Sequence, residues 1–260
     1  MFHKSIEEMF PEPPEGLDPA ALIEERVPKH IAVIMDGNGR WAKKRAMNRL
    51  NGHKAGIEAV RETIRCASDA GVRYLTLYSF STENWSRPQA EVTGLMDLFA
   101  KTMLAEVDAL NEEGVRVMTI GADSGLPERT RAAFAEAWER TRSNSGMTLV
   151  IAVNYGGRQE ILDAVNSLLA QDRARAAVGG APFRVDEDLF SSHLYTSAIP
   201  DPDLVIRTSG EVRISNFLLW QIAYSEIYCT DVLWPDFDRY EFLRALLDYQ
   251  GRNRRFGGVE

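Results

Sequence analysis

Asp36 lies between an apolar stretch and a glycine turn, in a segment that is otherwise strongly basic. The turn is Gly37-Asn38-Gly39, and its two glycines allow backbone conformations that a Cβ atom would forbid. No acidic residue occurs between Gly37 and Ile57, whereas cations are frequent there: Arg40, Lys43, Lys44, Arg45, Arg49 and Lys54. Amide groups at a helix start after such a turn bind anions, and a carboxylate beside a phosphate suits a divalent metal, most naturally magnesium. The segment therefore predicts a site for a phosphate and magnesium.

Two further groups of polar residues could serve the same site. They are Ser81, Glu83, Asn84, Trp85 and Arg87 in one group, and Arg207, Thr208, Ser209, Gly210, Arg213 and Ser215 in the other. Two separated pairs of arginines, Arg40 with Arg49 and Arg207 with Arg213, predict two anionic groups, because guanidinium holds diphosphate oxygens in a fixed orientation. Arg207 ends an apolar run, and a buried arginine is rare without an anionic partner.

The apolar pattern predicts the elements that must position these groups. Runs rich in β-branched residues predict strands, which we place at 30–35, 72–80, 115–121, 147–157, 203–210 and 226–234. Helical spacing predicts helices, which we place from residue 40 onward and at 55–70, 91–114, 126–142, 158–177, 186–195, 214–224 and 240–250. This alternation predicts an α/β fold with a mostly parallel six-stranded sheet and helices on both faces. Ligands of such sheets bind beyond the carboxyl ends of the strands, where the polar groups fall.

The length and composition predict a single domain. The chain has 260 residues, a formal charge of −8 and a pI near 5.2, which argues against general nucleic-acid binding. We expect one catalytic domain over 28–260, preceded by a proline-containing arm, 1–27, that is partly ordered at best. Cys66 and Cys229 have no metal-like spacing, so we expect free thiols in a reducing cytoplasm. No apolar run approaches the ~18 residues of a membrane span, and no signal peptide is recognisable.

A dinucleotide-binding fingerprint is the main alternative for the glycine turn. Gly37, Gly39 and Ala42 fit the pattern G-x-G-x-x-A after a strand. Against this interpretation, the acidic residue that binds ribose is expected about 20 residues further on, whereas the second strand ends only near residue 80. The helix after the glycines would also carry a dense cluster of cations. The phosphate-binding pattern G-x-x-x-x-G-K-[ST] is absent.

Several of the residues also have purely structural interpretations. Asp36 could cap the following helix, and His53 could be a helix-entry residue. Glu226 opens the sixth strand and could be an ion-pair partner. The apolar faces of 57–67 and 95–110 are core by default but could also wall a tunnel, and periodicity does not separate these two possibilities.

Long motifs along the chain carry a resemblance to a known family. They are HIAVIMDGNGRWAKKR, GHKAG, LYSFSTENWSRP, NYGGRQEI and DLVIRTSGEVRISNFLLWQIAYSEIYCTDVLWPDF. In this order they resemble the bacterial cis-prenyltransferases, in particular the undecaprenyl diphosphate synthases, also called isoprenyl transferases. The resemblance runs from about residue 28 to 258, so the first 27 residues lie outside it.

The resemblance implies an activity. Members of the family condense isopentenyl diphosphate repeatedly onto an allylic diphosphate such as farnesyl diphosphate, in a magnesium-dependent reaction that forms cis double bonds. The implied product is a long-chain polyprenyl diphosphate, undecaprenyl diphosphate, which is the precursor of the lipid carrier for cell-wall synthesis. The family also implies a cytoplasmic homodimer, no nucleic-acid partner, at most peripheral membrane contact, and an apolar tunnel beneath the carboxyl ends of the strands.

The resemblance also assigns roles to residues of this sequence. It implies that Asp36, Asn84 and His53 are catalytic and that Asp36 and Glu226 are linked to magnesium. The implied allylic site and its wall comprise Gly37, Asn38, Gly39, Arg40, Trp41, Arg49, His53, Ser81, Thr82, Glu83, Trp85 and Arg87. The implied isopentenyl diphosphate site comprises Arg207, Arg213, Ile214 and Ser215. The tail Arg255-Phe256-Gly257 resembles the family's terminal R-x-G, which reaches across a homodimer toward the substrate.

Asn84 is the proton acceptor in the family pattern. Because a neutral amide is a poor base, we expect Asn84 to relay a proton to Asp36, His53 or a diphosphate oxygen. Product length is left open by the sequence. It depends on side-chain bulk at the end of the tunnel, where Leu149, Ile151 and the apolar face of 95–110 are candidates.

The absence of an Asp-Asp pair favours the cis type of enzyme, because the trans-prenyltransferases hold their metals with DDxxD pairs. A dinucleotide-dependent oxidoreductase and a non-catalytic scaffold subunit are the alternative functions. The second should lack Asp36 or the arginines, and this chain keeps them.

Overall fold

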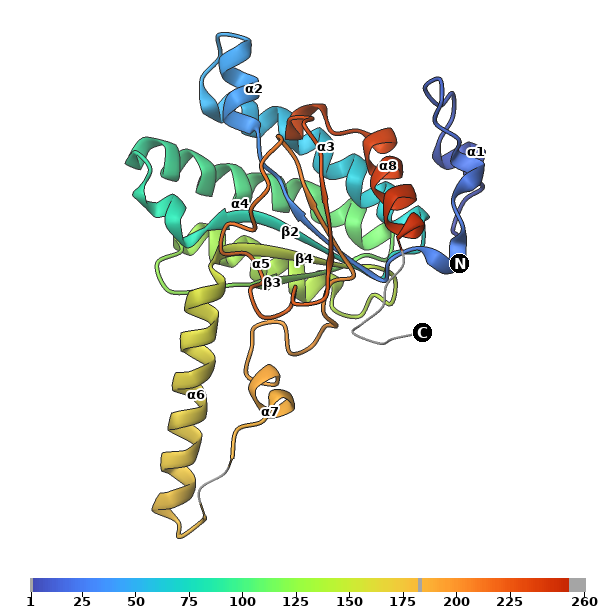
Figure 1. Cartoon of the computed structure of the whole chain (residues 1–260). Coiled ribbons are helices and arrows are strands. Elements are labelled where there is room, and N and C mark those ends of the chain that lie inside the picture. Colours follow the sequence, from blue (N-terminus) through green and yellow to red (C-terminus); the bar gives the residue numbers. More distant parts are fainter. Residues whose placement is uncertain (1, 182–183, 253–260) are drawn as a thin grey trace.

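A parallel β-sheet forms the centre of the molecule in the computed structural model, which describes residues 2–181 and 184–252 (Figure 1). Its strands are β1 (His30–Ile34), β2 (Tyr74–Ser81), β3 (Arg116–Ile120), β4 (Thr148–Tyr155), β5 (Leu204–Arg207) and β6 (Glu226–Cys229). They lie in the order β3-β4-β2-β1-β5-β6, and all neighbouring pairs are parallel. The predicted six-stranded parallel α/β fold is confirmed. The R-x-G tail lies outside the described residues.

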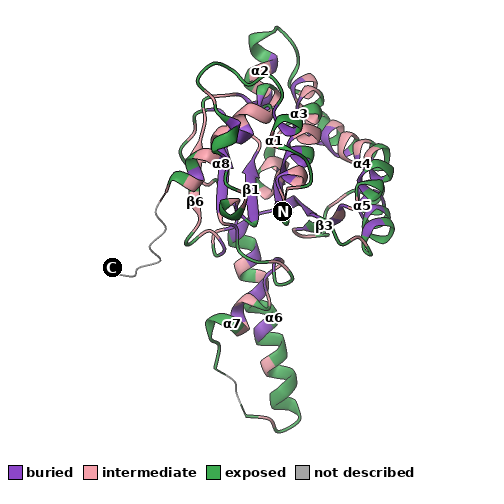
Figure 2. Ribbon diagram, turned by 90° about the vertical axis from the view of Figure 1, so that its right-hand side faces the viewer, coloured by how far each residue is buried: buried purple, intermediate pink, exposed green. Residues whose placement is uncertain are grey.

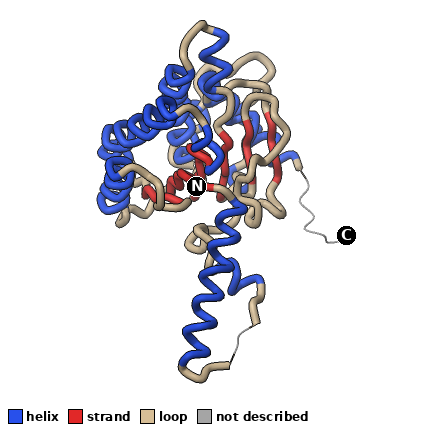
Figure 3. Tube along the Cα trace, turned by 90° about the vertical axis from the view of Figure 1, so that its left-hand side faces the viewer, coloured by secondary structure: helices blue, strands red, loops and turns tan. Residues whose placement is uncertain are grey.

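Helices lie on both sides of this sheet. They are α1 (Ile6–Met9), α2 (Asn38–Lys44), α3 (Arg49–Asp69), α4 (Gln89–Glu112), α5 (Glu128–Thr141), α6 (Gly157–Ala177), α7 (Glu187–Ser191) and α8 (Arg239–Gly251). Figure 1 shows α3, α4 and α8 on one side, and α6 projecting from the other side with α7 beside it, as Figure 3 also shows. None of the helices in the described part of the chain is both long and apolar enough to cross a bilayer.

The main hydrophobic core lies between the sheet and helices α3, α4, α5 and α8. Side chains alternate along β1, so that Ile31 and Val33 face this core whereas Ala32 and Ile34 face the opposite side. All of β4 is buried, as expected for a strand covered on both faces, and most of α6 is exposed (Figure 2). Residues Met9, Phe10 and Leu22, from the expected N-terminal arm, also belong to the main core.

The segment 214–224 forms a series of turns, so the predicted helix at this place is wrong. Ser215, Asn216 and Leu218 have positive φ angles of 48°, 61° and 47°. A left-handed residue interrupts a right-handed helix, and three within four positions exclude one. The apolar spacing that resembled a helix instead places Phe217 and Leu218, both fully buried, against the sheet face that α3 and α4 do not cover.

The basic segment after β1 is divided between two helices. Ala46, with φ of 55°, lies between α2 and α3. The two helices come very close at Gly52, where an added Cβ atom would lie 2.0 Å from the backbone oxygen of Asn38. This close approach requires glycine, and it fixes the turn after β1 against α3.

Candidate active site

Asp36 follows β1 and is held from several directions. Its Oδ1 accepts a hydrogen bond from the Gly37 backbone N at 2.7 Å, and its Oδ2 accepts from Arg207 Nη2 at 2.9 Å and from Arg40 Nη2 at 3.4 Å. Burial alone would raise the pKa of Asp36, but the hydrogen bonds from Arg207 and Gly37 and the charges of the two arginines outweigh it and hold the pKa below its usual value. The carboxylate is therefore ionised at neutral pH.

Gly37 shapes the turn that holds this carboxylate. Its φ of 110° lies in the region that L side chains rarely adopt, and a Cβ atom would lie 3.0 Å from Cα of Leu233. Both conditions favour glycine. The backbone oxygen of Asp36 accepts a hydrogen bond from Thr208 Oγ1 at 2.6 Å and from the Trp234 N at 3.0 Å. The end of β1 is thus fixed to residues that follow β5 and β6.

Arg207 ends β5, next to β1 in the sheet, and is only 4% exposed. Besides Asp36, its guanidinium donates to Ser215 Oγ at 2.7 Å and to the backbone oxygen of Arg213. Its Nε is buried without a hydrogen-bond partner, and so is Oδ1 of Asn38 nearby in the same cavity. Unpartnered buried polar atoms are rare, and a free donor on a buried arginine suits an anionic oxygen.

A basic pocket of about 530 Å³ lies over the turn and α2. Its lining consists of Asp36, Gly37, Gly39, Arg40, Lys43, Ala46, Met47, Asn48 and Arg49. Arg40 is anchored there by a hydrogen bond to the Ser209 backbone oxygen at 2.9 Å and by Glu211 at 3.3 Å. This pocket brings together the glycine turn and three of the six cations of the basic segment, Arg40, Lys43 and Arg49.

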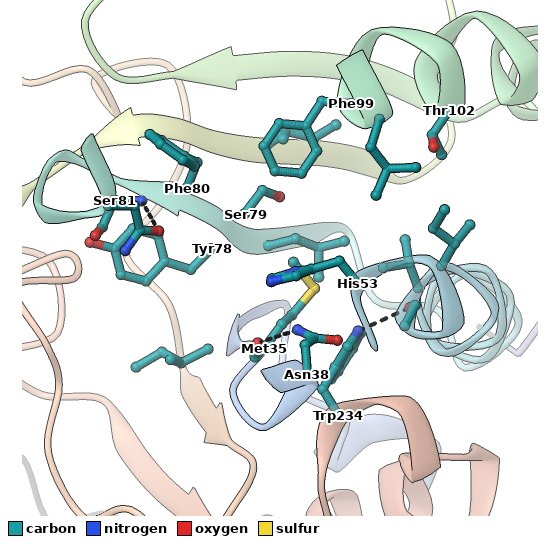
Figure 4. Close-up of a pocket in the computed structure, with 18 of the residues that line it drawn as sticks. Met35, Asn38, His53, Tyr78, Ser79, Phe80, Ser81, Phe99, Thr102 and Trp234 are labelled. Atoms are coloured by element: carbon teal, nitrogen blue, oxygen red, sulfur yellow. Dashed lines mark hydrogen bonds between the residues drawn. The ribbon is translucent and has the colours of Figure 1, made fainter. Parts of the chain in front are cut away.

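A second, largely apolar cavity of about 630 Å³ begins at the same carboxylate and extends between the sheet, α3 and α4. Its polar end includes Asp36, Asn38, His53, Ser81, Glu83, Asn84, Arg87, Arg207, Ser215 and Asn216. Its apolar part includes Ile57, Val60, Ile64, Leu77, Leu98, Phe99, Met103, Leu110, Phe134, Leu149 and Ile151. Figure 4 shows side chains from β2, α3 and α4 converging on this space, with His53 reaching into it from α3. Asp36 lines both cavities.

His53 and Asn84 both line the polar end of this cavity, and neither is charged at pH 7. Burial, and then the nearby charges of Arg87 and Arg49, lower the pKa of His53 to about 4, so the imidazole is neutral at pH 7. Asn84 Oδ1 accepts a hydrogen bond from the Ser81 backbone N at 3.2 Å, which leaves the amide hydrogens free to donate. Two uncharged polar side chains thus line the same cavity as the ionised carboxylate of Asp36.

Glu91 is a residue of this site that the sequence analysis missed. Its Oε1 lies 3.1 Å from Arg87 Nη1 and 3.4 Å from Arg49 Nε, and its side chain is 13% exposed. The i, i+4 spacing from Arg87 could have suggested the first pair. The contact with Arg49 joins the start of α4 to the start of α3, and local spacing carries no signal for it.

Some of the predicted residues lie outside both cavities. Arg213 is exposed and pairs with Glu211, and Ile214 and Thr82 line neither cavity. Trp41 donates to Asp236 Oδ1 at 2.6 Å. Trp85 packs edge-on against Phe80 and donates to Asn154 Oδ1 at 2.7 Å. The two tryptophan side chains are thus held by polar partners outside the two cavities.

Glu226 lies far from Asp36 within one chain. It opens β6, level with Leu204 at the start of β5, whereas Asp36 lies beyond the other end of the sheet. Its carboxylate pairs with Arg252 Nη1 at 2.8 Å. In the residues that the structure describes, no group of three or more His, Cys, Asp or Glu side chains could hold a metal ion. Asp36 alone fits magnesium only if phosphate oxygens complete the set, which is how this ion is commonly held.

Sequence comparisons with known proteins show to which family the chain is similar. A sequence model of the family described as "Putative undecaprenyl diphosphate synthase" matches residues 34–257. An isoprenyl transferase of Thermotoga maritima is 50% identical over 234 residues, 90% of this chain and 98% of that protein. One of Clostridium perfringens is 48% identical over 247 residues, 95% and 96% of the two chains.

Solved structures show the same fold. Lavandulyl diphosphate synthase from Lavandula x intermedia, crystallised with dimethylallyl diphosphate, has a TM-score of 0.84 and 36% identity, covering 90% of this chain and 99% of that one. A "probable undecaprenyl diphosphate synthase" from Campylobacter jejuni has a TM-score of 0.74 and 28% identity, covering 88% and 98%.

Proposed function

The chain belongs to the undecaprenyl diphosphate synthase family of prenyltransferases, and we propose that it condenses isopentenyl diphosphate repeatedly onto an allylic diphosphate, starting from farnesyl diphosphate. The observation that carries this proposal is that Asp36 lines both the basic pocket and the polar end of the apolar cavity. A diphosphate in the first and a hydrocarbon in the second would belong to one substrate, with its reacting carbon beside Asp36. The proposed product is undecaprenyl diphosphate, the lipid-carrier precursor of cell-wall synthesis.

We assign the allylic diphosphate to the basic pocket. Gly37, Gly39, Arg40 and Arg49 line that pocket and would bind the phosphate oxygens. The surrounding wall is assigned to Asn38, Trp41, His53, Ser81, Thr82, Glu83, Trp85 and Arg87. As the carbon–oxygen bond breaks, negative charge grows on the leaving diphosphate, and fixed guanidinium groups stabilise that charge most where water is excluded.

Isopentenyl diphosphate is assigned to the other side of Asp36. The free Nε of Arg207 would donate to its phosphate, with Ser215 beside it and Arg213 and Ile214 at the entrance. Its C3–C4 double bond would then attack the allylic carbon as that carbon becomes cationic. The apolar lining supports this step, because a carbocation survives only where water is excluded.

Asp36 would hold magnesium together with diphosphate oxygens, and the ion when bound supplies charge stabilisation to the leaving group. The C2 proton must also leave. We propose that Asn84 relays this proton to His53, to Asp36 or to a diphosphate oxygen. Burial and the charges of Arg87 and Arg49 lower the pKa of His53 to about 4, so the ring is unprotonated at pH 7 but a weak base, and the negative charge of a neighbouring diphosphate would raise its pKa and make it a better acceptor.

We further propose a homodimer that uses the β6 edge of the sheet. Ile227 on β6 is 42% exposed, and Leu162 and Leu169 on the projecting α6 are 56% and 49% exposed. Among the described strands β6 lies at an edge of the sheet, and edge strands and exposed apolar side chains are features that protein interfaces cover. Glu226 would then act as a magnesium-linked carboxylate on the partner's site. Cytoplasmic location, and peripheral membrane contact during product release, remain predictions from the resemblance.

The test is incubation of the purified protein with labelled isopentenyl diphosphate, farnesyl diphosphate and magnesium, followed by sizing of the lipid. We expect long-chain polyprenyl diphosphates that depend on the added magnesium. Tight binding of a nicotinamide cofactor by calorimetry, with no binding of either diphosphate, would instead favour the oxidoreductase alternative.

A further inference from the structure

Asn216 holds the turn that follows β2 from one side. This turn, Thr82–Ser86, is a short 3₁₀ helix with Asn84 at its centre, and we call it the relay turn. Asn216 Nδ2 donates a hydrogen bond to Glu83 Oε1 at 2.7 Å, and Asn216 Oδ1 accepts one from the backbone N of Arg158 at 2.9 Å. The residue before Asn84 is therefore tied, through Asn216, to the start of α6.

Asn154, near the end of β4, holds the relay turn from the other side. Its Oδ1 accepts a hydrogen bond from Trp85 Nε1 at 2.7 Å. Its Nδ2 donates to the backbone oxygens of Ala122 and Ser124, in the loop after β3, at 2.8 and 2.9 Å. Asn154 is only 6% exposed, and both of its amide hydrogens are used. The residue after Asn84 is thus tied to a buried and fully bonded side chain.

Both asparagines have a left-handed backbone, with φ angles of 51° for Asn154 and 61° for Asn216. Glycine adopts this conformation most easily, because a Cβ atom makes it less favourable. If only the backbone shape mattered, glycine would serve better at both positions. The side-chain amides are what glycine cannot supply, and strained residues of this kind cluster at active sites.

Asn216 also joins the relay turn to the proposed isopentenyl diphosphate site. It follows Ser215, whose Oγ accepts a hydrogen bond from Arg207 at 2.7 Å. Asn216 and Asn84 both line the apolar cavity. The position of Asn84 is therefore fixed relative to the residues that we assign to the substrate whose C2 proton must leave.

We propose that Asn154 and Asn216 are positioning residues for the removal of this proton, because together they hold Asn84 beside C2 of isopentenyl diphosphate. The inference rests on the proposed function. In this step the C2–H bond breaks, its electron pair forms the C2–C3 double bond, and the proton passes by way of Asn84 to His53, Asp36 or a diphosphate oxygen. Each positioning residue fixes a neighbour of Asn84, and the hydrogen bond from the Ser81 backbone N to Asn84 Oδ1 at 3.2 Å fixes the amide itself.

The first test measures a single turnover with isopentenyl diphosphate that carries either hydrogen or deuterium at C2. Asn154→Gly and Asn216→Gly keep the left-handed backbone and remove only the side-chain contacts. We expect each to slow condensation by about 10- to 100-fold, since a displacement of about 1 Å costs on the order of 100-fold in rate. The deuterium isotope effect should exceed that of the wild type, because proton removal becomes the slow step. The Michaelis constants of both substrates should change much less than the rate.

An exchange of donor and acceptor tests the contact of Asn216 directly. Asn216→Asp places a second carboxylate against Glu83 and should slow condensation. Addition of Glu83→Gln supplies an amide that can donate to the new carboxylate, so the double variant should regain rate and lose part of the raised isotope effect. On the other side of the turn, Trp85→Phe removes the Nε1 donor and keeps an aromatic ring, and it should reproduce the effect of Asn154→Gly.

Asn144→Ala is the matched control. Asn144 Nδ2 donates to Asn111 Oδ1 at 3.1 Å and to the backbone oxygen of Val115 at 2.8 Å, so this amide also joins separate elements. It lines neither the basic pocket nor the apolar cavity. We expect lower thermal stability with the rate and isotope effect of the wild type, which is the result that a merely structural role would give for the two positioning residues as well.

Three results would overturn the inference. The first is a wild-type rate in folded Asn154→Gly and Asn216→Gly proteins. The second is a slower rate with an unchanged isotope effect, which would place the defect in another step. The third is a double variant that is no faster than Asn216→Asp. If a glycine variant does not fold, Trp85→Phe and the exchange decide. A wild-type protein that forms no prenyl product would instead remove the proposed function, and it is recognised because there is no turnover to measure.

Discussion

Replacement of Arg207 by alanine tests the assignment of the isopentenyl diphosphate site. The residue is 4% exposed, and its guanidinium is fixed by hydrogen bonds to Asp36 and Ser215 at the polar end of the apolar cavity. One lost hydrogen bond to a charged group is worth about 1.5–3 kcal/mol, which is roughly a 10- to 150-fold loss in affinity. We therefore expect the Michaelis constant for isopentenyl diphosphate to rise by that factor.

The allylic substrate should respond much less, because Arg207 lines the apolar cavity but not the basic pocket. Arg207→Lys keeps a positive charge but lacks the fixed fork of donors, so it should fall between wild type and alanine. The assay is the initial rate measured against each substrate with the other saturating. Arg239→Ala is the control, since it breaks a half-buried ion pair with Glu62 away from both cavities.

The same variant should change the pH dependence of the reaction. The hydrogen bond from Arg207 is the largest of the effects that lower the pKa of Asp36 against the opposing effect of burial. Without this hydrogen bond the pKa of Asp36 rises, so its carboxylate is protonated at a higher pH. The fall in activity on the acidic side of the pH profile should therefore shift to higher pH. An unchanged Michaelis constant for isopentenyl diphosphate, with the acid limb also unmoved, would refute this account of Arg207.

Three other predictions concern the remaining polar end of the site. Asp36→Ala should abolish turnover and leave the fold intact by circular dichroism, because the ionised carboxylate is lost; a variant with full activity would remove the proposed mechanism. Glu91→Gln should raise the Michaelis constant for the allylic diphosphate by roughly 2- to 10-fold, since it loosens two arginines at about 0.5–1.5 kcal/mol; an equal effect on isopentenyl diphosphate alone would contradict this. In the folded protein the pKa of His53 is about 4, whereas its ordinary value is near 6.5. Between these pH values the unfolded state therefore binds more protons than the folded state. The free energy of unfolding should rise with pH across this range, by up to about 1.4 kcal/mol per pH unit. Urea unfolding of wild type and His53→Gln from pH 4.5 to 7.5 would measure this, and equal slopes for the two proteins would contradict it.

The strands were predictable because their signals are local. The run 30–35 corresponds to β1 (His30–Ile34) and 147–157 to β4 (Thr148–Tyr155), each bounded by proline, glycine or a polar residue. Buried parallel strands read as continuous apolar runs, and the rule that ligands bind at their carboxyl ends was enough to bring Asp36 and Arg207 to one edge.

Other features depend on contacts that no local pattern carries. The turns over 214–224 contain left-handed residues that are not glycine, and their apolar spacing is the same as that of a helix. The pairing register places Glu226 at the start of β6, away from Asp36, although the family resemblance implied that both carboxylates are linked to magnesium. The bridge from Glu91 to Arg49 requires knowledge of how α3 and α4 pack together.

The order of the strands places Arg207 beside Asp36, where Nε of Arg207 is buried without a hydrogen-bond partner. β1 and β5 are hydrogen-bonded neighbours, and Ile34 lies opposite Arg207. Asp36 follows Ile34 by two residues, and its carboxylate accepts a hydrogen bond from the Arg207 guanidinium. The pair leaves Nε of Arg207 buried and without a partner, and a buried donor of this kind costs about 1–3 kcal/mol. A structural ion pair would gain by satisfying every donor. An unused donor beside an ionised carboxylate suits an anionic substrate, and this supports our proposal that the Asp36–Arg207 pair belongs to the binding machinery.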